Sequence, residues 1–381
     1  MDIKKKELGI YIHIPFCVSK CIYCDFLSMP VNDETKALYV NSLCEEIKEF
    51  AASHRDEYIV STVFLGGGTP SSLKPFLTEQ IFNCLRECFV FEEDCEITVE
   101  CNPGTVDLFK LTTYKNIGVN RLSFGMQSVN DEELKALGRI HTYKDFLKSY
   151  EIALKAGFDN INVDLMSALP GQTVESWRKT LREITRLKTS HISAYSLILE
   201  EGTTMYNLVE NGIITNLPDE DTEREIYFIT KEILEKAGYH RYEISNYSRD
   251  GRECKHNKIY WQGGDYIGFG LGAASYIGRK RFSNIKDLSK YIDKPLSDKE
   301  DITLLSEEDM MAEFMYLGLR MMEGVKPSDF KNRFGRHLMN VYGDVINKYV
   351  VTGHMETGEN YVRLTTRGID VSNVIFSDFL L

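Results

Sequence analysis

Six short runs rich in β-branched and apolar residues alternate with longer amphipathic segments, and this alternation constrains the fold more than any other feature of the sequence. The runs are residues 10–16, 62–65, 96–100, 121–125, 161–166 and 191–197. Helix-like stretches between them include residues 34–52, for which Asp33 is the expected N-cap, 77–89, 142–156 and 174–187. Repeated strand–turn–helix units predict an α/β fold with parallel strands, and right-handed crossovers curl six such units into a partial (β/α)6, TIM-like barrel.

The pattern changes after about residue 215. A helix is expected at 219–238, followed by an aromatic and polar stretch at 239–276. Further on, helical patterning at 306–322 and 337–350 precedes an expected β-hairpin at 354–365 that turns at Gly358, and a last helix ends near residue 379. We therefore expect a barrel at 1–215, a connecting region at 216–300, and a small winged-helix-like α+β domain at 301–381.

Composition narrows the class of protein. The 381 residues carry a net charge of -12 and form no long block of Lys and Arg, which argues against a nucleic-acid partner. No apolar run has the length of a signal peptide or a membrane span, so we expect a cytoplasmic protein. In that compartment, the nine cysteines are better explained as reduced thiols or metal ligands than as disulfides.

Three of the cysteines, Cys17, Cys21 and Cys24, follow the first run with CxxxCxxC spacing. Three thiolates in one short loop can ligate three irons of a [4Fe–4S] cubane, which leaves the fourth iron open to chelation by an amino acid. Structural zinc competes chemically, but it prefers four ligands, and no fourth Cys or His follows within a few residues. His13 precedes the triplet in a strand that should be buried. The alternative is three buried thiols that share this spacing by chance.

The remaining cysteines favour a structural interpretation. Cys84 and Cys88 repeat the CxxxC spacing, but no CxxC follows them, and they lie one turn apart on an amphipathic segment. We expect them to be core residues, together with Cys44, Cys95 and Cys101.

Polar residues follow successive runs, at the strand ends where a barrel builds its ligand site. A glycine-rich loop, Gly66–Pro70, follows the second run, and its glycines expose backbone N–H and C=O groups to a ligand. Glu100 ends the third run, Gln127 and Arg139 follow the fourth, and Asp164 lies in the fifth. Taken singly, each carboxylate is as well explained by a satisfied core position and Arg139 by a surface ion pair. Their shared placement favours a binding site.

The cysteine triplet and the motifs GGGTP, ExNP, SFGxQS, LGRxH and DLM with LPGQT resemble, in this order, the radical SAM superfamily. More narrowly, they resemble the group that contains oxygen-independent coproporphyrinogen III oxidases and haem chaperones, over essentially the whole chain. The resemblance implies a [4Fe–4S] cluster on the three cysteines and S-adenosylmethionine (SAM) bound by a further set of residues. These are Tyr11, Tyr23, Gly67, Gly68, Thr69, Glu100, Gln127, Arg139 and Asp164. Ser167-Ala168 departs from the glycine that often precedes Leu-Pro-Gly in the family.

Three features separate the two activities of this group. Oxidases typically carry a further cysteine where Phe26 stands, and they have a long extension before the first strand, where this chain has about ten residues. The third feature is the segment from His256 to Trp261, which matches an HNxxYW motif of the chaperones. Imidazole is a common haem ligand, so the resemblance makes His256 the candidate ligand, with Cys254 as an alternative. Without the resemblance, a loop histidine beside two core aromatics is the simpler explanation.

The function that the resemblance implies is that of a haem chaperone, which binds haem and delivers it to apo-haemoproteins such as respiratory enzymes, with at most peripheral membrane contact. The alternative is an oxygen-independent coproporphyrinogen III oxidase of porphyrin biosynthesis, which makes protoporphyrinogen IX by radical oxidative decarboxylation. A structural iron–sulfur or zinc protein is a third, remote possibility. The sequence assigns no residue to catalysis.

Overall fold

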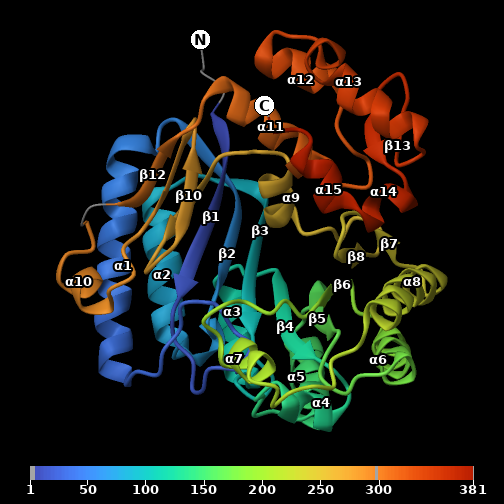
Figure 1. The fold of residues 1–381 in the computed structure, drawn as a ribbon. Helices are drawn as coiled ribbons and strands as arrows, with labels where there is room; N and C mark the ends of the chain where they lie inside the picture. The colour runs from blue at the N-terminus through green and yellow to red at the C-terminus, as the bar shows by residue number, and fades with distance from the viewer. Residues whose placement is uncertain (1–4, 297–298, 381) are drawn as a thin grey trace.

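The computed structural model describes residues 5–296 and 299–380 and is an α/β protein built on one large sheet (Figure 1). Six parallel strands form its centre, in the order β1 to β6. They are β1 (Lys6–Ile14), β2 (Tyr58–Gly67), β3 (Phe91–Cys101), β4 (Arg121–Gln127), β5 (Ile161–Ser167) and β6 (His191–Ser196). Each was expected from the sequence, and the partial barrel is confirmed.

Helices cover the outer face of these strands (Figure 1). The long ones are α1 (Asp33–His54), α2 (Pro75–Cys88), α5 (Tyr143–Lys155), α6 (Val174–Leu187) and α8 (Glu220–Lys236). The connections also contain the short helices η1 (Pro70–Ser72), α3 (Leu108–Asn116), α4 (Asp131–Ala136) and α7 (Thr204–Glu210). The expected cap of α1 was wrong by one residue. Asn32 is the N-cap and accepts a hydrogen bond from the Thr35 amide at 2.8 Å, while Asp33 lies in the first turn, where its charge favours the helix dipole.

The segment between α8 and residue 304 extends the sheet at both edges. Beside β6 lie the antiparallel strands β8 (Asn246–Ser248) and β7 (His240–Arg241). At the other edge, β9 (Tyr266–Phe269) pairs in parallel with β1, and β10 (Ala274–Ile277), β11 (Lys280–Ser283) and β12 (Glu300–Leu304) follow in antiparallel order. Two short helices, α9 (Lys255–Trp261) and α10 (Leu288–Asp293), complete this segment. The HNxxYW motif is therefore helical.

The C-terminal residues form a helical unit with one hairpin, drawn in red in Figure 1. Its elements are α11 (Glu307–Gly318), α12 (Pro327–Phe334), α13 (Leu338–Val351), β13 (Met355–Thr357), β14 (Val362–Leu364), α14 (Thr366–Asp370) and α15 (Ser372–Ser377). A separate hydrophobic core, which includes Met315, Phe330 and Tyr342, holds it together. The hairpin and the two main helices were expected, and α12 was not.

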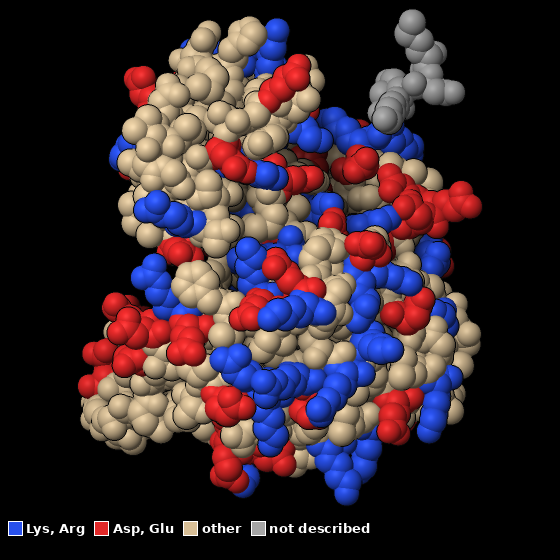
Figure 2. Space-filling view, turned by 90° about the vertical axis from the view of Figure 1, so that its right-hand side faces the viewer, with Lys and Arg blue, Asp and Glu red and all other residues tan. Residues whose placement is uncertain are grey.

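The surface is mixed in charge where it can be seen in Figure 2. On this face, Lys and Arg side chains lie among Asp and Glu side chains. Ion pairs along α6, such as Arg186 with Glu183, contribute to this pattern. No helix in the described part of the chain is long and apolar enough to cross a lipid bilayer.

Candidate functional site

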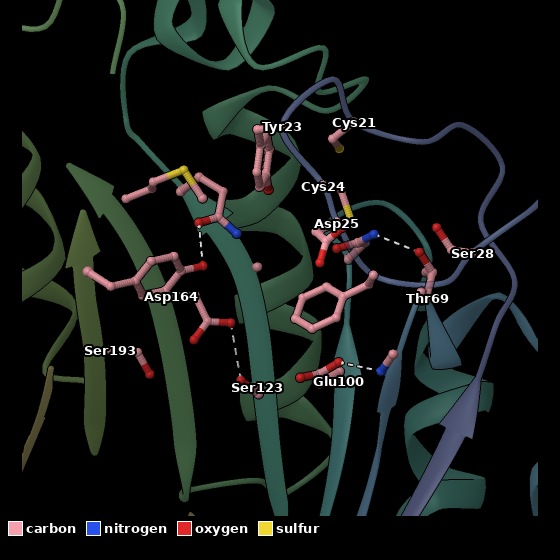
Figure 3. A pocket seen from close by; sticks show the side chains of 18 of the residues that line it. Cys21, Tyr23, Cys24, Asp25, Ser28, Thr69, Glu100, Ser123, Asp164 and Ser193 are labelled. Carbon is pink, nitrogen blue, oxygen red and sulfur yellow. Dashed lines mark hydrogen bonds between the residues drawn. The ribbon is translucent and has the colours of Figure 1, made fainter. Parts of the chain in front are cut away.

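A cavity of about 530 Å³ lies at the carboxyl ends of the barrel strands, below the loop that carries the three cysteines. Figure 3 shows Cys21, Cys24 and Tyr23 at one side of this upper cavity and Glu100, Ser123 and Asp164 at the other. All three cysteines of the triplet line it, together with the residues predicted to contact SAM except Tyr11. The structure thus gathers residues from five strand ends and one loop around a single space.

The cysteine loop between β1 and α1 is fixed at both its base and its tip. At the base, the Cys17 amide donates to the Met29 carbonyl at 3.1 Å, and the Met29 amide donates to the Pro15 carbonyl at 2.9 Å. Near the tip, the Ile22 amide donates to the Leu137 carbonyl, and a Cβ atom at Gly138 would lie 3.2 Å from the Ile22 side chain. The loop is therefore held against the segment that leads to Arg139.

The six remaining cysteines are buried, whereas Cys17, Cys21 and Cys24 are half-buried. Burial raises the pKa of the Cys21 and Cys24 thiols, and the positive charge of Arg139 opposes the shift at Cys21. Since the thiolate is the form that binds metal, loading of this site must release protons.

The glycine-rich loop after β2 passes too close to its neighbours to carry side chains. Gly67 has a φ of +114°, and a Cβ atom there would lie 2.6 Å from the His13 ring. At Gly68, a Cβ atom would lie 3.0 Å from the Cys17 sulfur. The Thr69 hydroxyl accepts a hydrogen bond from the side-chain amide of Asn102 at 2.8 Å and lies 3.3 Å from the Cys17 sulfur. Backbone N–H and C=O groups are therefore accessible to a ligand directly beside the Cys17 thiol.

Carboxylates from β3 and β5 face each other across the cavity. Glu100 accepts a hydrogen bond from the backbone amide of Gly67 at 3.1 Å. Asp164 accepts one from the side-chain amide of Asn162 at 2.7 Å and one from the Ser123 hydroxyl at 3.3 Å. Burial raises the pKa of Glu100 to about 8, and the nearby Asp164 charge adds to the shift. Burial likewise raises the pKa of Asp164.

Two more predicted residues are held by neighbours that line the same cavity. The Gln127 side chain, at a backbone φ of +70°, accepts a hydrogen bond from the Tyr195 hydroxyl at 3.1 Å. Arg139 donates from Nη1 to the Asn102 side chain at 3.2 Å, while its buried Nε has no hydrogen-bond partner among the described residues. The site therefore contains a cation, Arg139, whose Nε–H group can donate a hydrogen bond to a ligand.

A second cavity, of about 330 Å³, lies deeper in the barrel and shares Gly67, Glu100 and Asp164 with the upper one. Tyr11 and His256 line this lower cavity. Every residue predicted to bind SAM, together with His256, therefore lines one cavity or the other.

The candidate haem ligands are not accessible in this conformation. His256 is 1% exposed, and its two ring nitrogens contact the hydroxyls of Thr62 at 2.7 Å and Tyr260 at 2.8 Å. Burial lowers the pKa of His256 to about 3, so the ring is neutral. Cys254 is completely buried, with its sulfur 3.6 Å from a Glu96 oxygen. Coordination of iron by either side chain would require helix α9 to move.

Several cavity residues were not assigned a role from the sequence. Asn102 and Ser123 lie inside motifs that were recognised, whereas Tyr195, Arg121 and Asn162 do not. The available signal is strand alternation, because residues 121, 123 and 125 of β4 all line one cavity or the other.

Comparison with known proteins identifies the relatives of this chain. Residues 11–184 match the radical SAM superfamily, and residues 305–371 match the HemN C-terminal domain. The protein named heme chaperone HemW in Bacillus subtilis (strain 168) is 38% identical over 378 residues, covering 97% of this chain and 98% of that protein. The protein of the same name in Lactococcus lactis subsp. lactis (strain IL1403) is 35% identical and covers 99% and 98%.

A solved structure supports the fold. Coproporphyrinogen III oxidase (HemN) from Escherichia coli matches with a TM-score of 0.86 at 22% identity, covering 100% of this chain and 91% of that chain. The barrel and the cysteine loop at its rim define the class, a radical SAM-type protein. Within the radical SAM superfamily, the chain belongs to the HemW family. Membership of the superfamily implies a [4Fe–4S] cluster and SAM as cofactors.

Proposed function

We propose that this protein is a haem chaperone, which binds haem and passes it to apo-haemoproteins, and that a SAM-bound [4Fe–4S] cluster occupies its upper cavity. One observation carries the proposal: the chain aligns over almost its whole length with proteins named heme chaperone HemW. The cluster is supported separately, because the cysteine triplet lines the same cavity as the polar residues at the strand ends. The fold alone would not separate a chaperone from an oxidase.

Cys17, Cys21 and Cys24 suit a cluster better than a single ion. In the part of the chain that the structure describes, no three His, Cys, Asp or Glu side chains are arranged to hold one metal ion. A cubane asks for a different arrangement, because each thiolate binds a separate iron. The open fourth iron would face the upper cavity.

The cavity walls suit SAM. Gly67, Gly68 and Thr69 offer backbone groups beside Cys17, where a side chain would not fit. Glu100 and Asp164 supply carboxylates for an ammonium group and ribose hydroxyls, and the unpartnered Arg139 Nε supplies a donor for a carboxylate. Tyr23 and Gln127 complete the upper wall, and Tyr11 lies below. When bound, the cluster would supply redox chemistry at SAM.

Haem transfer is proposed to serve respiratory apo-haemoproteins from the cytoplasmic side, with peripheral membrane contact at most. The acidic chain, with a net charge of -12, and the mixed charge of the face in Figure 2 support a protein partner over a nucleic acid. Phe26, which is 65% exposed at the mouth of both cavities, stands where oxidases typically carry a cysteine, and this supports the chaperone over the oxidase.

Haem titration tests the function directly. Anaerobically reconstituted protein should bind haem and transfer it to an apo-haemoprotein, followed by the absorption spectrum of the acceptor. In parallel, the protein is incubated with coproporphyrinogen III, SAM and a reductant. Formation of protoporphyrinogen, or the absence of haem binding, would reject the chaperone proposal.

The cluster is tested with two matched variants. Cys21→Ser should lose most of its iron and the brown cluster absorption, because one of three iron ligands is removed. Cys88→Ser should keep both, since Cys88 is buried on α2, away from the cavity. Equal iron contents in the two variants would argue against the cysteine triplet as the ligands of the cluster.

A further inference from the structure

The lower cavity is lined by a buried cation, Arg121, that forms no ion pair with the described carboxylates. Arg121 is the first residue of β4 and pairs in register with Thr98 of β3, below the level of Glu100. Its side chain lines the lower cavity although the residue is only 2% exposed. Its Nε has no hydrogen-bond partner among the described residues. A buried guanidinium N–H group without a hydrogen-bond partner is costly, so its presence at a cavity wall points to a ligand.

Glu96 and Asp164, whose charges act on Arg121, accept hydrogen bonds from other donors. Asp164 accepts hydrogen bonds from Asn162 and Ser123. Glu96 accepts hydrogen bonds from the backbone amides of Lys255 and His256 at 3.2 and 3.1 Å. Both charges act on Arg121 only through space, without a hydrogen bond. An incoming acceptor therefore meets a guanidinium that still has free N–H groups.

Glu100, on the same wall, adds little negative charge. Its pKa of about 8 keeps most of this carboxyl protonated at neutral pH. An anionic group that enters the lower cavity thus faces the carboxylate of Asp164 but not that of Glu100 as well. In this setting, a ligand carboxylate suits Arg121, because the fork of its guanidinium matches two carboxylate oxygens.

Aromatic side chains form the opposite wall of the lower cavity. Phe64 lies at its centre, stacked on His256 at 5.2 Å and on Tyr11 at 6.3 Å between ring centroids, and Tyr260 stands edge-on to His256. A flat unsaturated ring fits against such a wall. The two walls together select a flat ring that carries a carboxylate.

We propose that Arg121 anchors a propionate of haem, and that the lower cavity receives one propionate-bearing edge of the macrocycle. This inference rests on the haem-binding function proposed above. A volume of about 330 Å³ takes a pyrrole ring with its side chain and not a whole tetrapyrrole. The anchor is independent of iron ligation, since both ring nitrogens of His256 are engaged by hydroxyls. The methionyl carboxylate of SAM has the same chemistry and is the other possible source.

A comparison of haem with its esterified form tests the anchor in the wild-type protein, and variants at Arg121 test it independently. Haem and its dimethyl ester are titrated into the anaerobically reconstituted holoprotein, and into Arg121→Gln, Arg121→Lys and Arg86→Gln. We expect the wild type to bind haem roughly tenfold to a hundredfold more tightly than the ester. Arg121→Gln should lose this preference, Arg121→Lys should keep part of it, and Arg86→Gln, altered on the exposed side of α2, should keep all of it. SAM affinity should be the same in all four proteins.

The outcomes separate the anchor from the chaperone function. If the wild type binds neither haem nor the ester, the proposed function itself fails. If it binds both equally, or if Arg121→Gln still prefers haem, the anchor is wrong and the chaperone function stands. A loss of SAM affinity in Arg121→Gln with unchanged haem preference would show that Arg121 binds the methionyl carboxylate of SAM and not a haem propionate. The ester comparison in the wild type does not depend on the folding of Arg121→Gln, and Arg121→Lys keeps a positive charge beside Glu96 and Asp164.

Discussion

Glu100 links the protonation of the site to the stability of the protein. Its pKa of about 8 in the folded chain exceeds the value near 4.3 of a free glutamate. The folded state therefore keeps a proton that the unfolded state releases, so this contribution to stability is complete below about pH 4.3 and is lost as the pH rises through 8. Burial also lowers the pKa of His141 to about 4 and that of His256 to about 3. These two shifts change the free energy of unfolding only below about pH 6.5.

A comparison between pH 7 and 8.5 tests this effect. Over that range the free energy of unfolding of the SAM-free wild type should fall by roughly 1 kcal/mol more than that of Glu100→Gln, measured by urea denaturation. The variant still loses the stability linked to its buried cysteines, whose pKa values burial raises, but its amide does not titrate. Glu87→Gln, an exposed change on α2, serves as the control and should follow the wild type. Parallel curves for Glu100→Gln and the wild type would refute the raised pKa.

Single residues differ in how far the sequence reveals them. The cysteine triplet and the strand-end residues, such as Glu100 and Asp164, were identifiable because they recur at fixed spacings within motifs. Arg121 and Tyr195 were not, because an inward-facing strand residue looks the same in sequence whether it fills a core or lines a cavity. The depth of His256 was also hidden, since only the packing of α9 against β2 determines it.

Among the elements, α9 depends on a residue far away in the chain. Its N-cap, Cys254, makes no capping hydrogen bond through its side chain. Glu96 of β3 takes that role by accepting from the amides of Lys255 and His256. This cap, which comes from a strand about 160 residues earlier in the same chain, fixes the end of α9 that lines the lower cavity. Haem binding through α9 would therefore depend on Glu96.

Substitution of this cap should loosen α9 selectively. In Glu96→Gln, we expect amide hydrogen exchange in α9 to accelerate about tenfold, because hydrogen bonds to a charged acceptor are weakened. The measurement is exchange followed by mass spectrometry. Glu93→Gln, an exposed change on the same strand, should leave α9 unaffected. Equal exchange of α9 in the two variants would show that Glu96 does not hold the helix.

The sequence pattern predicts those helices and strands whose stabilising interactions lie within their own segment. Helix α6 spans the predicted residues, 174–187, because its apolar spacing and its capping box at Thr173 both lie within the segment. The edge strands escaped prediction because they are two to five residues long and exist only through distant partners. Strand β9, for example, pairs with β1 across more than 250 residues of chain.

At the scale of the molecule, the barrel and the C-terminal unit have separate cores and meet at a polar junction. The barrel core and the C-terminal core are separate clusters of buried side chains. Between them, Arg320 lies 4.3 Å from the centre of the Trp261 ring, Arg281 pairs with Glu313 at 2.7 Å, and the Met322 amide donates to the Tyr242 carbonyl. Polar contacts of this kind couple two units more weakly than a shared apolar core does.

Ligand binding should therefore protect the two units unequally. With SAM at about 100 times its dissociation constant, global opening of the barrel should become about a hundredfold rarer, since the ligand binds only the folded barrel. Hydrogen exchange in β1 to β6 should slow by that factor in the holoprotein, whereas exchange in α13 should not change. The comparison needs only the wild type, with and without SAM. If α13 slowed as much as the strands, the chain would unfold as one unit, and the polar junction would be as strong as a core.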